Sequence, residues 1–351
     1  MEINRREAII SLAALAANVS AADTKSAAVI IKGVDRYRVC EPMYEGIRVI
    51  LASRGEKYSP AYIQGISGAA FRIAGPCPCA PTCAGAIPFD EFIRLLGYEN
   101  ETILSPKKNE DEKKWLAATL LRIHDEVKAG RPVLVFHAFT SAEWDVVCGF
   151  DLDKKQLIGR GSYKGDGKDY AREDEARMLT AKEICDIIGP TLIGKKTGSF
   201  DAHTAEMNAL KEAVRYARST AQKYPYPGIQ CYNLWIDQWS KPEPRKPDWL
   251  SDGYTSGVYR STQKAAADFL REIKPRLPEA SSKLELAAKQ FAIVAKALDD
   301  FHVLLFPKTN AKITPNEATL REQSKKALTL LSTARNAYNK GIDGIEEAIK
   351  A

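Results

Sequence analysis

One cysteine in this chain of 351 residues stands where a thiol is easily activated. Cys40 lies two residues before Pro42, and proline suits the first turn of a helix because its missing N–H has no partner there. The apolar residues that follow recur at helical spacing: Met43, Ile47, Ile50 and Leu51. The positive end of a helix dipole favours thiolate, so the pattern predicts a nucleophilic thiol at Cys40. The alternative is a buried cysteine with a structural role.

Ser67 is a second candidate nucleophile, in the string Gly65-Ile-Ser-Gly-Ala69. The string is close to the G-x-S-x-G elbow of serine hydrolases, with alanine in place of the last glycine. A true elbow joins a strand to a helix, and residues 58–66 do not have the pattern of a strand. The small residues of this region therefore predict close packing between helices rather than a serine hydrolase.

The cysteines at 77, 79 and 83 form the densest group among the seven cysteines of the chain. They lie in a proline-rich loop, where Cys83 could form a disulfide with either Cys77 or Cys79 in an oxidising compartment. A zinc site is the alternative, but it needs a fourth ligand and no histidine or CxxC pair lies nearby. We therefore expect no metal and no cofactor.

Residue periodicity predicts an α+β protein, with helices first, a small antiparallel sheet next and helices at the C-terminus. Helices are expected over 34–55, 59–71, 89–96, 110–129 and 207–221. Short connections predict antiparallel strands over 131–136, 144–150, 156–163 and 191–195. Aromatic residues and prolines make 225–260 an irregular segment, expected to pack on the sheet domain. The helices from residue 262 onward include two that should begin with capping boxes, at Ser282 and at Thr314.

The first 22 residues resemble a secretory leader of the twin-arginine type. Arg5 and Arg6 precede a mildly apolar stretch, and Ser20-Ala-Ala22 fits a cleavage site between small residues. We expect a bacterial protein exported to the periplasm or cell envelope, and the alternative is an amphipathic helix. No other apolar run is long enough to span a bilayer, so an integral membrane protein is not expected. The net charge of +6 is dispersed, which argues against a nucleic-acid partner.

Four strings of the chain resemble a bacterial family of papain-like thiol enzymes. In order they are Tyr37-Arg-Val-Cys40, Gly65-Ile-Ser-Gly-Ala-Ala-Phe-Arg72, Gly130-Arg-Pro-Val-Leu-Val135 and Trp144-Asp-Val-Val-Cys-Gly-Phe-Asp151. The family carries the N-terminal domain of butirosin biosynthesis protein H, which is similar to the peptidase domain that removes double-glycine leaders. The resemblance implies a papain-like domain over 23–224, a connecting segment over 225–260 and a helical bundle over 261–351.

The resemblance also implies a Cys-His-Asp or Cys-His-Asn site that acts on an amide or a thioester. Cys40 matches the family's nucleophile. The family's histidine position holds Trp144 and Asp145 here, so the nearest imidazole, His137, becomes the candidate base and Asp145 its polar partner. The pocket residues implied are Ser67, Arg72, Trp144 and Arg160. The other histidines are expected to be structural: His124 on the surface of a helix, His203 at the start of a helix and His302 in the tail.

Two further positions depart from the family. The strand that normally carries the orienting carboxylate has Ile158-Gly-Arg-Gly161 here, and Asp35 and Arg36 stand where a glutamine supports the oxyanion. Two functions therefore remain open. One is a thiol hydrolase or acyltransferase that acts on a peptide or a small acyl thioester. The other is a catalytically inactive binding protein on the same fold, in which Cys40 is not unusually reactive.

Overall fold

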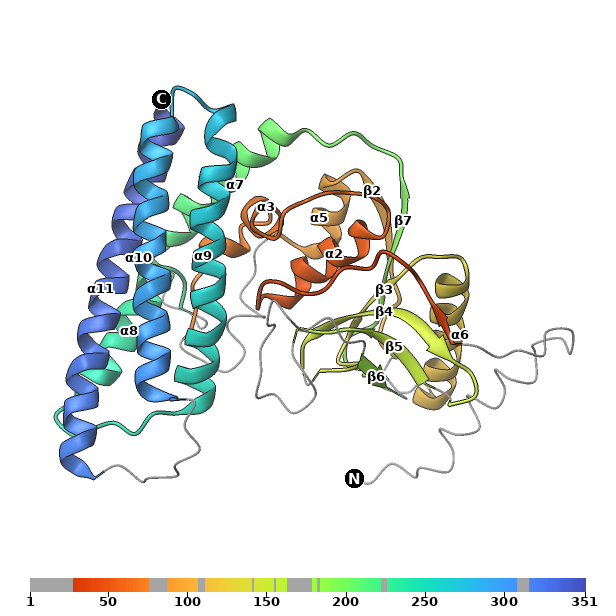
Figure 1. Ribbon diagram of the computed structural model, residues 1–351, viewed down its shortest axis with the longest axis horizontal. Coiled ribbons are helices and arrows are strands. Elements are labelled where there is room, and N and C mark those ends of the chain that lie inside the picture. The colour runs from red at the N-terminus through yellow and green to blue at the C-terminus, as the bar shows by residue number, and fades with distance from the viewer. Residues whose placement is uncertain are drawn as a thin grey trace, which may run out of the picture. The chain divides into compact units, whose positions relative to one another are not determined.

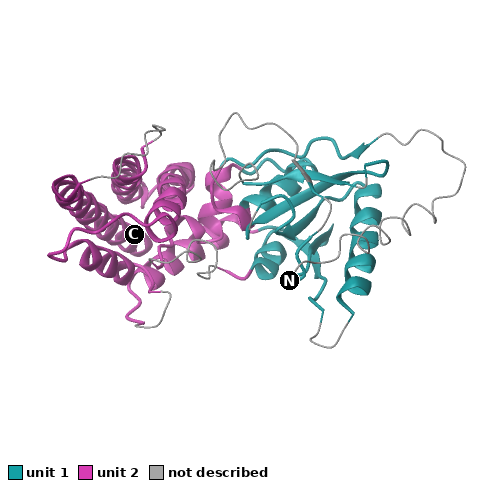
Figure 2. Cartoon of the chain, turned by 90° about the horizontal axis from the view of Figure 1, so that it is seen from below, with its two compact units in different colours: residues 1–38, 45–58, 89–200 teal, residues 39–44, 59–88, 201–351 magenta. Residues whose placement is uncertain are grey.

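The strands and helices of the chain are distributed over two units, which Figure 2 draws in different colours. Unit 1 comprises residues 1–38, 45–58 and 89–200, and unit 2 comprises residues 39–44, 59–88 and 201–351. The computed structural model describes residues 28–75, 87–106, 111–140, 142–154, 156–162, 179–181, 184–221, 226–307 and 316–351. The predicted leader at 1–22 and the loop cysteines Cys77, Cys79 and Cys83 lie outside the described residues.

Unit 1 is built on an antiparallel sheet, as the short connections predict. Its strands follow one another in the order β2 (Tyr98–Thr102), β7 (Thr191–Lys196), β3 (Val133–Phe136), β4 (Trp144–Asp151), β5 (Gln156–Arg160) and β6 (Leu179–Ala181). β1 (Val29–Ile30) pairs with the second half of β4, beyond the residues that pair with β3. Residue periodicity does not indicate β1, β2 or β6, because β1 and β6 are very short and β2 is a polar strand, Tyr-Glu-Asn-Glu-Thr, with no apolar run.

The core of unit 1 lies between the sheet and α6 (Glu112–Lys128). Leu120, Ile123 and Val127 of this helix pack against Val133 and Val147 of the sheet. Every residue of β4 is buried, which explains why the strand reads as a nearly continuous apolar run. α5 (Phe89–Leu95) leads into β2 and completes the unit.

Helix α2 (Pro42–Ala52) begins at Pro42, as its sequence predicts. Its residues from Glu45 onward belong to unit 1. Gly46 is the point of closest approach, because a β-carbon there would lie 2.6 Å from Cδ1 of Leu134 and 2.8 Å from the hydroxyl of Tyr37. Glycine at this position therefore lets the helix lie directly on β3.

Arg48 fastens the segment before α2 to the helix. Its side chain is only 4% exposed and pairs with Glu45 and Asp35, each at 2.7 Å. The same guanidinium donates to the carbonyl of Arg36, and Glu45 accepts the backbone N–H of Arg38. Partial burial raises the pKa of Asp35, but hydrogen bonds from Arg38 and Arg48 outweigh it and lower the pKa to about 2. We call these four side chains the Arg48 cluster: Asp35, Arg38, Glu45 and Arg48.

Unit 2 is helical, in agreement with the prediction for the C-terminal part. Three long helices lie side by side: α9 (Thr255–Ile273), α10 (Ser281–Leu305) and α11 (Glu317–Lys350) (Figure 1). α7 (Ala202–Ala217) and α8 (Ile229–Trp239) pack on α11, and α3 (Pro60–Ile66) with the short turn η1 (Ala69–Phe71) packs on α9. Phe71 meets Phe269 and Phe291 edge to face, and Tyr338 donates to the Phe71 carbonyl at 2.7 Å.

The prediction of an irregular segment over 225–260 is wrong. Much of it is helical, in α8 and in the π-helix η2 (Trp249–Tyr254), and it belongs to unit 2 rather than to the sheet unit. Trp235 and Trp239 donate their indole N–H groups to the buried carboxylate of Asp252, at 2.8 and 3.3 Å. Trp235 and Trp239 therefore lie on the buried face of a helix, and the prolines of the segment lie outside that helix, before Ile229 and after Trp239.

Two predicted helix caps also differ. α10 begins at Ser281, one residue before the predicted cap. Glu285 forms an ion pair with Lys274 at 2.7 Å instead of closing a capping box with Ser282. α11 is capped by Asn316, whose side chain accepts the backbone N–H of Thr319 at 2.9 Å. Thr314 lies outside the described residues. Asparagine is among the best N-cap residues, so the later start agrees with ordinary capping preferences.

Replacing Arg48 with methionine should destabilise the protein strongly. Arg48→Met keeps the apolar stem but leaves the carboxylate of Glu45, which is fully buried, without its guanidinium. Loss of one partner from a buried pair costs about 3–5 kcal/mol of the free energy of unfolding. The matched control is Arg94→Met, which breaks an exposed pair with Asp90 and should cost less than about 1 kcal/mol. Equal losses in urea denaturation of the two variants would contradict a structural role for the Arg48 cluster.

Candidate functional site

Cys40 lies directly before α2, in unit 2. The residue is 9% exposed, so its thiol is almost covered. Its backbone N–H donates to the hydroxyl of Ser261 on α9 at 3.2 Å. In thiol and serine enzymes the N–H of the nucleophile usually points at the developing oxyanion. Here the same group has an internal acceptor.

Glu41 caps α2 with its side chain. The carboxylate accepts the backbone N–H groups of Met43 and Tyr44, at 3.2 and 3.1 Å, which are the positions that an N-cap side chain serves. The side-chain amide of Gln64 donates to it at 3.0 Å. Burial raises the pKa of Glu41, and the hydrogen bond from Gln64 and the charge of Arg72 act in the opposite direction. When Glu41 is ionised, its negative charge is stabilised by the positive end of α2, which is the same end that would stabilise a thiolate at Cys40.

Three further polar side chains complete this region of unit 2. Arg72 is 5% exposed and follows η1. Tyr44 donates its hydroxyl to the carbonyl of Ile87, and burial raises its pKa, opposed by the charge of Arg72. Gln64 is fully buried, and its Oε1 has no hydrogen-bond partner among the residues that the structure describes. We call this group the Glu41 cluster: Glu41, Tyr44, Gln64 and Arg72.

Of this cluster, only Arg72 is among the site residues that the resemblance implies, and Glu41, Tyr44 and Gln64 are additions from the structure. An acidic residue directly before Pro42 is a signal for an N-cap, since proline favours the first helical position. The contact with Gln64 joins residues 23 positions apart, and no local pattern could have indicated it.

His137 follows β3 in unit 1, where the chain enters the loop that leads to β4. Its φ of +54° lies in the left-handed region, which is uncommon for a residue other than glycine. Its backbone N–H donates to the carbonyl of Glu143 at 2.7 Å, which holds the loop closed. The side chain is exposed. Ala142 in the same loop also has a positive φ, of +59°, so both ends of the loop have left-handed backbone.

Asp145 holds the loop that follows His137. One oxygen of its fully buried carboxyl accepts the N–H groups of Ala138, Phe139 and Thr140 at 2.9, 2.7 and 3.0 Å. The other oxygen lies 2.6 Å from the hydroxyl of Thr140. Burial raises the pKa of Asp145 to about 7, although these hydrogen bonds oppose it. Asp145 therefore fixes the backbone beside the imidazole.

The remaining predicted pocket residues of unit 1 lie in the sheet. Trp144 begins β4, is 4% exposed and packs its ring on Phe89 and Phe136. Arg160 ends β5. Burial raises the pKa of Cys148 to about 12, and the charge of Arg160 acts against this rise. Cys40 belongs to unit 2 and His137 to unit 1, so their pairing as nucleophile and base stays a prediction.

Ser67 does not have the geometry of a nucleophile elbow. It follows helix α3 rather than a strand, is fully buried and donates its hydroxyl to the carbonyl of Gln64 at 3.1 Å. A β-carbon on Gly65 would lie 2.1 Å from the ring of Phe269. The small residues therefore serve close packing of α3 on α9, as predicted.

The other histidines have structural surroundings. The prediction of a surface position for His124 is wrong, because the residue is 7% exposed and its ring packs at a tilt against Phe150, with centroids 4.2 Å apart. Burial lowers its pKa. The hydrophobic face of α6 is wider than the periodic residues indicate. His203 stands in the first turn of α7, as predicted, and Nδ1 of His302 on α10 lies 2.9 Å from the hydroxyl of Ser256.

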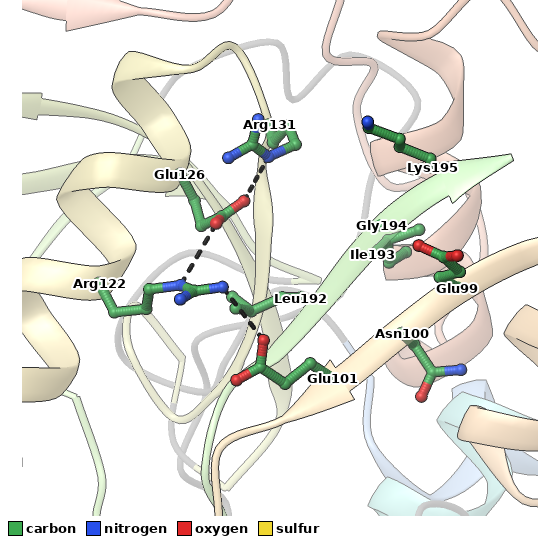
Figure 3. A pocket seen from close by; sticks show the side chains of 10 residues that line it. All are labelled: Glu99, Asn100, Glu101, Arg122, Glu126, Arg131, Leu192, Ile193, Gly194 and Lys195. Atoms are coloured by element: carbon green, nitrogen blue, oxygen red, sulfur yellow. Dashed lines mark hydrogen bonds and ion pairs between the residues drawn. The ribbon is translucent and has the colours of Figure 1, made fainter.

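A polar pocket in unit 1 contains none of the predicted residues. The cavity of about 510 Å³ lies between α6, β7 and β2 (Figure 3). Arg122 bridges Glu101 and Glu126 at 3.1 and 3.3 Å, and Arg131 pairs with Glu126. The charges that line it are balanced: Glu99, Glu101 and Glu126 against Arg122, Arg131 and Lys195. Because most of these charges satisfy one another, the pocket indicates no particular ligand.

No family model matches the chain, and no curated protein matches it. The resemblance to papain-like thiol enzymes therefore depends on the quoted strings alone. Within the described ranges, no group of three or more histidine, cysteine or acidic side chains could hold a metal ion. The helices of those ranges include none with the length and apolarity needed to cross a membrane.

Replacing Asp145 with asparagine should remove a pH dependence of stability. The pKa of Asp145 is about 7 in the folded chain and 3.8 without the fold. Since the folded pKa is raised, its stabilising contribution is complete below about pH 4 and is lost as the pH rises to about 7. Relative to Asp145→Asn, the wild-type chain should lose about 4 kcal/mol of its free energy of unfolding over this range. Urea denaturation at a series of pH values measures the difference.

Asp145→Ala is the matched comparison, because it removes the acceptor as well as the charge. Asparagine can keep its oxygen toward the three N–H groups and donate its amide to Thr140, as a protonated aspartate does. Alanine removes the acceptor of three backbone N–H groups and of the Thr140 hydroxyl, and should cost about 3–5 kcal/mol at every pH. Parallel stability curves for the wild type and Asp145→Asn would show that this carboxyl does not titrate near pH 7.

Proposed function

We propose that the chain is a thiol-dependent hydrolase or acyltransferase that acts through Cys40 on an amide or a thioester. The observation that carries the proposal is the position of Cys40, directly before α2 and next to the buried Glu41 cluster. Burying a carboxyl, a guanidinium and an amide together is unfavourable, and buried clusters that raise the pKa of a carboxyl, as here for Glu41, concentrate at functional sites. The resemblance to the N-terminal domain of butirosin biosynthesis protein H supports the same chemistry.

The proposed reaction passes through an acyl group on Cys40. The thiolate sulfur forms a bond to the carbonyl carbon, and the C–S bond of a thioester or the C–N bond of an amide breaks. The leaving thiol or amine takes up the proton that Cys40 has lost. Water or an amine then accepts the acyl group, which gives hydrolysis or acyl transfer. A small acyl thioester or a peptide is the proposed substrate class.

His137 is proposed as the base that takes the thiol proton. The support lies in unit 1, where His137 is exposed and strained, and where Asp145 holds the three residues that follow it. Asp145 would act as a positioning residue for the loop rather than as a direct partner of the imidazole. Exposure suits a base that must exchange protons with substrate and solvent.

The second candidate is a binding protein without catalytic activity, and the bond from Cys40 to Ser261 favours it. An N–H that already has an acceptor at 3.2 Å is less available to an oxyanion. Ionised Glu41 also opposes a second negative charge at the start of α2. On this alternative the Glu41 cluster would hold a ligand by hydrogen bonds and charge, and the sulfur would only contribute to packing.

The reactivity of Cys40 distinguishes the two candidates. For a thiol enzyme, iodoacetamide at neutral pH should modify Cys40 at least about tenfold faster than the half-buried Cys185, because the reactive species is the thiolate. His137→Ala should slow this modification if His137 is the base. Peptide mapping by mass spectrometry measures each cysteine separately. Modification of Cys40 only after unfolding, together with the core residue Cys231, would contradict the enzyme and favour the binding protein.

A thioester probe tests turnover itself. Acyl-N-acetylcysteamine thioesters should release free thiol in the presence of the wild-type chain and should leave an acyl mass on the Cys40 peptide. Cys40→Ser should abolish both signals, because the hydroxyl is a far weaker nucleophile without a tuned base. Cys185→Ser is the matched control and should leave the rate unchanged. Equal thiol release by all three proteins would sink the proposal.

A further inference from the structure

Unit 2 contains a second pocket, with a different charge pattern. It lies between the end of α8 and the first turns of α11 and encloses about 250 Å³. Three cationic side chains line it, Lys241 from the segment after α8 and Arg321 and Lys325 from α11. No acidic side chain is among the residues that line this pocket, in contrast to the balanced pocket of unit 1.

The two lysines of this pocket lack carboxylate partners in the described part of the chain. Neither Lys241 nor Lys325 forms an ion pair there, whereas Arg321 pairs with Glu317 at 2.6 Å and donates to the carbonyl of Pro242 at 3.3 Å. Arg321 and Lys325 are four residues apart on one helix, and like charges at this spacing repel each other. The pocket therefore carries an excess of positive charge that an anion would neutralise.

Ser324 adds a polar group without a partner. Its hydroxyl oxygen is buried and has no hydrogen-bond partner among the described residues, and the side chain lines the same pocket. Trp239 and Leu328 supply apolar walls. A hydroxyl, two unpaired ammonium groups and an apolar wall match a ligand with a compact anionic end and an organic remainder.

The helix dipole explains the position of only one of the three cations that line the pocket. A lysine after the C-terminus of α8 is favoured by the negative end of the helix dipole, which accounts for Lys241. The same effect does not account for Lys325 and Arg321, because they lie in the N-terminal part of α11. Glu317 accounts for Arg321, which leaves Lys325 as the cation of α11 that lines the pocket without an ion pair among the described residues.

We propose that this pocket of unit 2 binds a small phosphate monoester. Ammonium groups are compact point charges, and two of them together favour a compact group with two negative charges over a planar carboxylate. The volume is below the range of about 300–1,000 Å³ that is usual for drug-sized ligands, so the organic part must be small. The proposal does not depend on Cys40 or on its chemistry.

Isothermal titration calorimetry with phenyl phosphate tests the proposal on the full chain at physiological ionic strength. We expect saturable binding at one site, at least about tenfold tighter than that of benzoate, and no binding of the neutral benzamide. The double variant Lys241→Gln, Lys325→Gln should weaken phenyl phosphate at least about tenfold, since each charged hydrogen bond to phosphate contributes substantially. Equal affinity for benzoate would contradict a site for a doubly charged group.

Lys326→Gln is the matched control. Lys326 is the next residue along α11, pairs with Glu322 at 2.7 Å and does not line the pocket. Its loss removes the same charge from the same helix and should change the affinity less than about twofold. An equal loss in this control, or no saturable binding of phenyl phosphate to the wild type, would overturn the proposal. Unchanged thermal unfolding of the double variant confirms that it is folded, because both lysines are exposed.

Discussion

The buried charges around Arg48 are the constraint on which the region before α2 depends. Buried ion pairs add little net stability compared with apolar packing, but they permit few alternative geometries. Arg48 binds Glu45 within the helix and Asp35 before it, so the turn that leads to Cys40 has a fixed path. The resemblance to papain-like thiol enzymes, which stays a prediction, puts Asp35 and Arg36 at the position of an oxyanion glutamine. Because Asp35 is committed to Arg48, oxyanion support in this chain would have to come from another group.

Glu41 in unit 2 and Asp145 in unit 1 make the same kind of contact with the backbone. Each is a buried carboxyl that accepts backbone N–H groups, at the start of α2 in one case and after β3 in the other. Their surroundings differ, because burial raises both pKa values but only Glu41 has the opposing charge of Arg72. A carboxyl beside a thiol can exclude a second negative charge when ionised and admit it when protonated. If Cys40 is the nucleophile, a protonated Glu41 would leave the positive end of α2 free to favour its thiolate, and an ionised Glu41 would oppose it.

Local patterns predict the elements of this chain better than their contacts. Pro42 indicates the start of α2, and the short connections around β4 indicate an antiparallel sheet, because both depend on residues close in sequence. The local sequence does not indicate the polar strand β2, because its pairing with β7 decides its structure. It does not indicate the helix α8 either, because packing on α11 decides that one. The contact between Gln64 and Glu41 likewise depends on the fold and not on neighbours in sequence. The pairing of Cys40 with His137 could be proposed from the resemblance but not from any local pattern.

The strain at His137 and the hydrogen bond at Cys40 favour opposite conclusions about catalysis. His137 and Ala142 both have a positive φ in the loop between β3 and β4, and Glu143 and Asp145 hold the backbone on the two sides of His137. The left-handed histidine keeps an exposed imidazole at the end of β3, where a base could act. The N–H of Cys40, in contrast, is used internally by a serine hydroxyl, which is a weak and exchangeable acceptor compared with an oxyanion. A developing oxyanion could displace Ser261 from this N–H, so the bond does not by itself exclude catalysis. The reactivity of Cys40, rather than either of these contacts, separates the thiol enzyme from the binding protein.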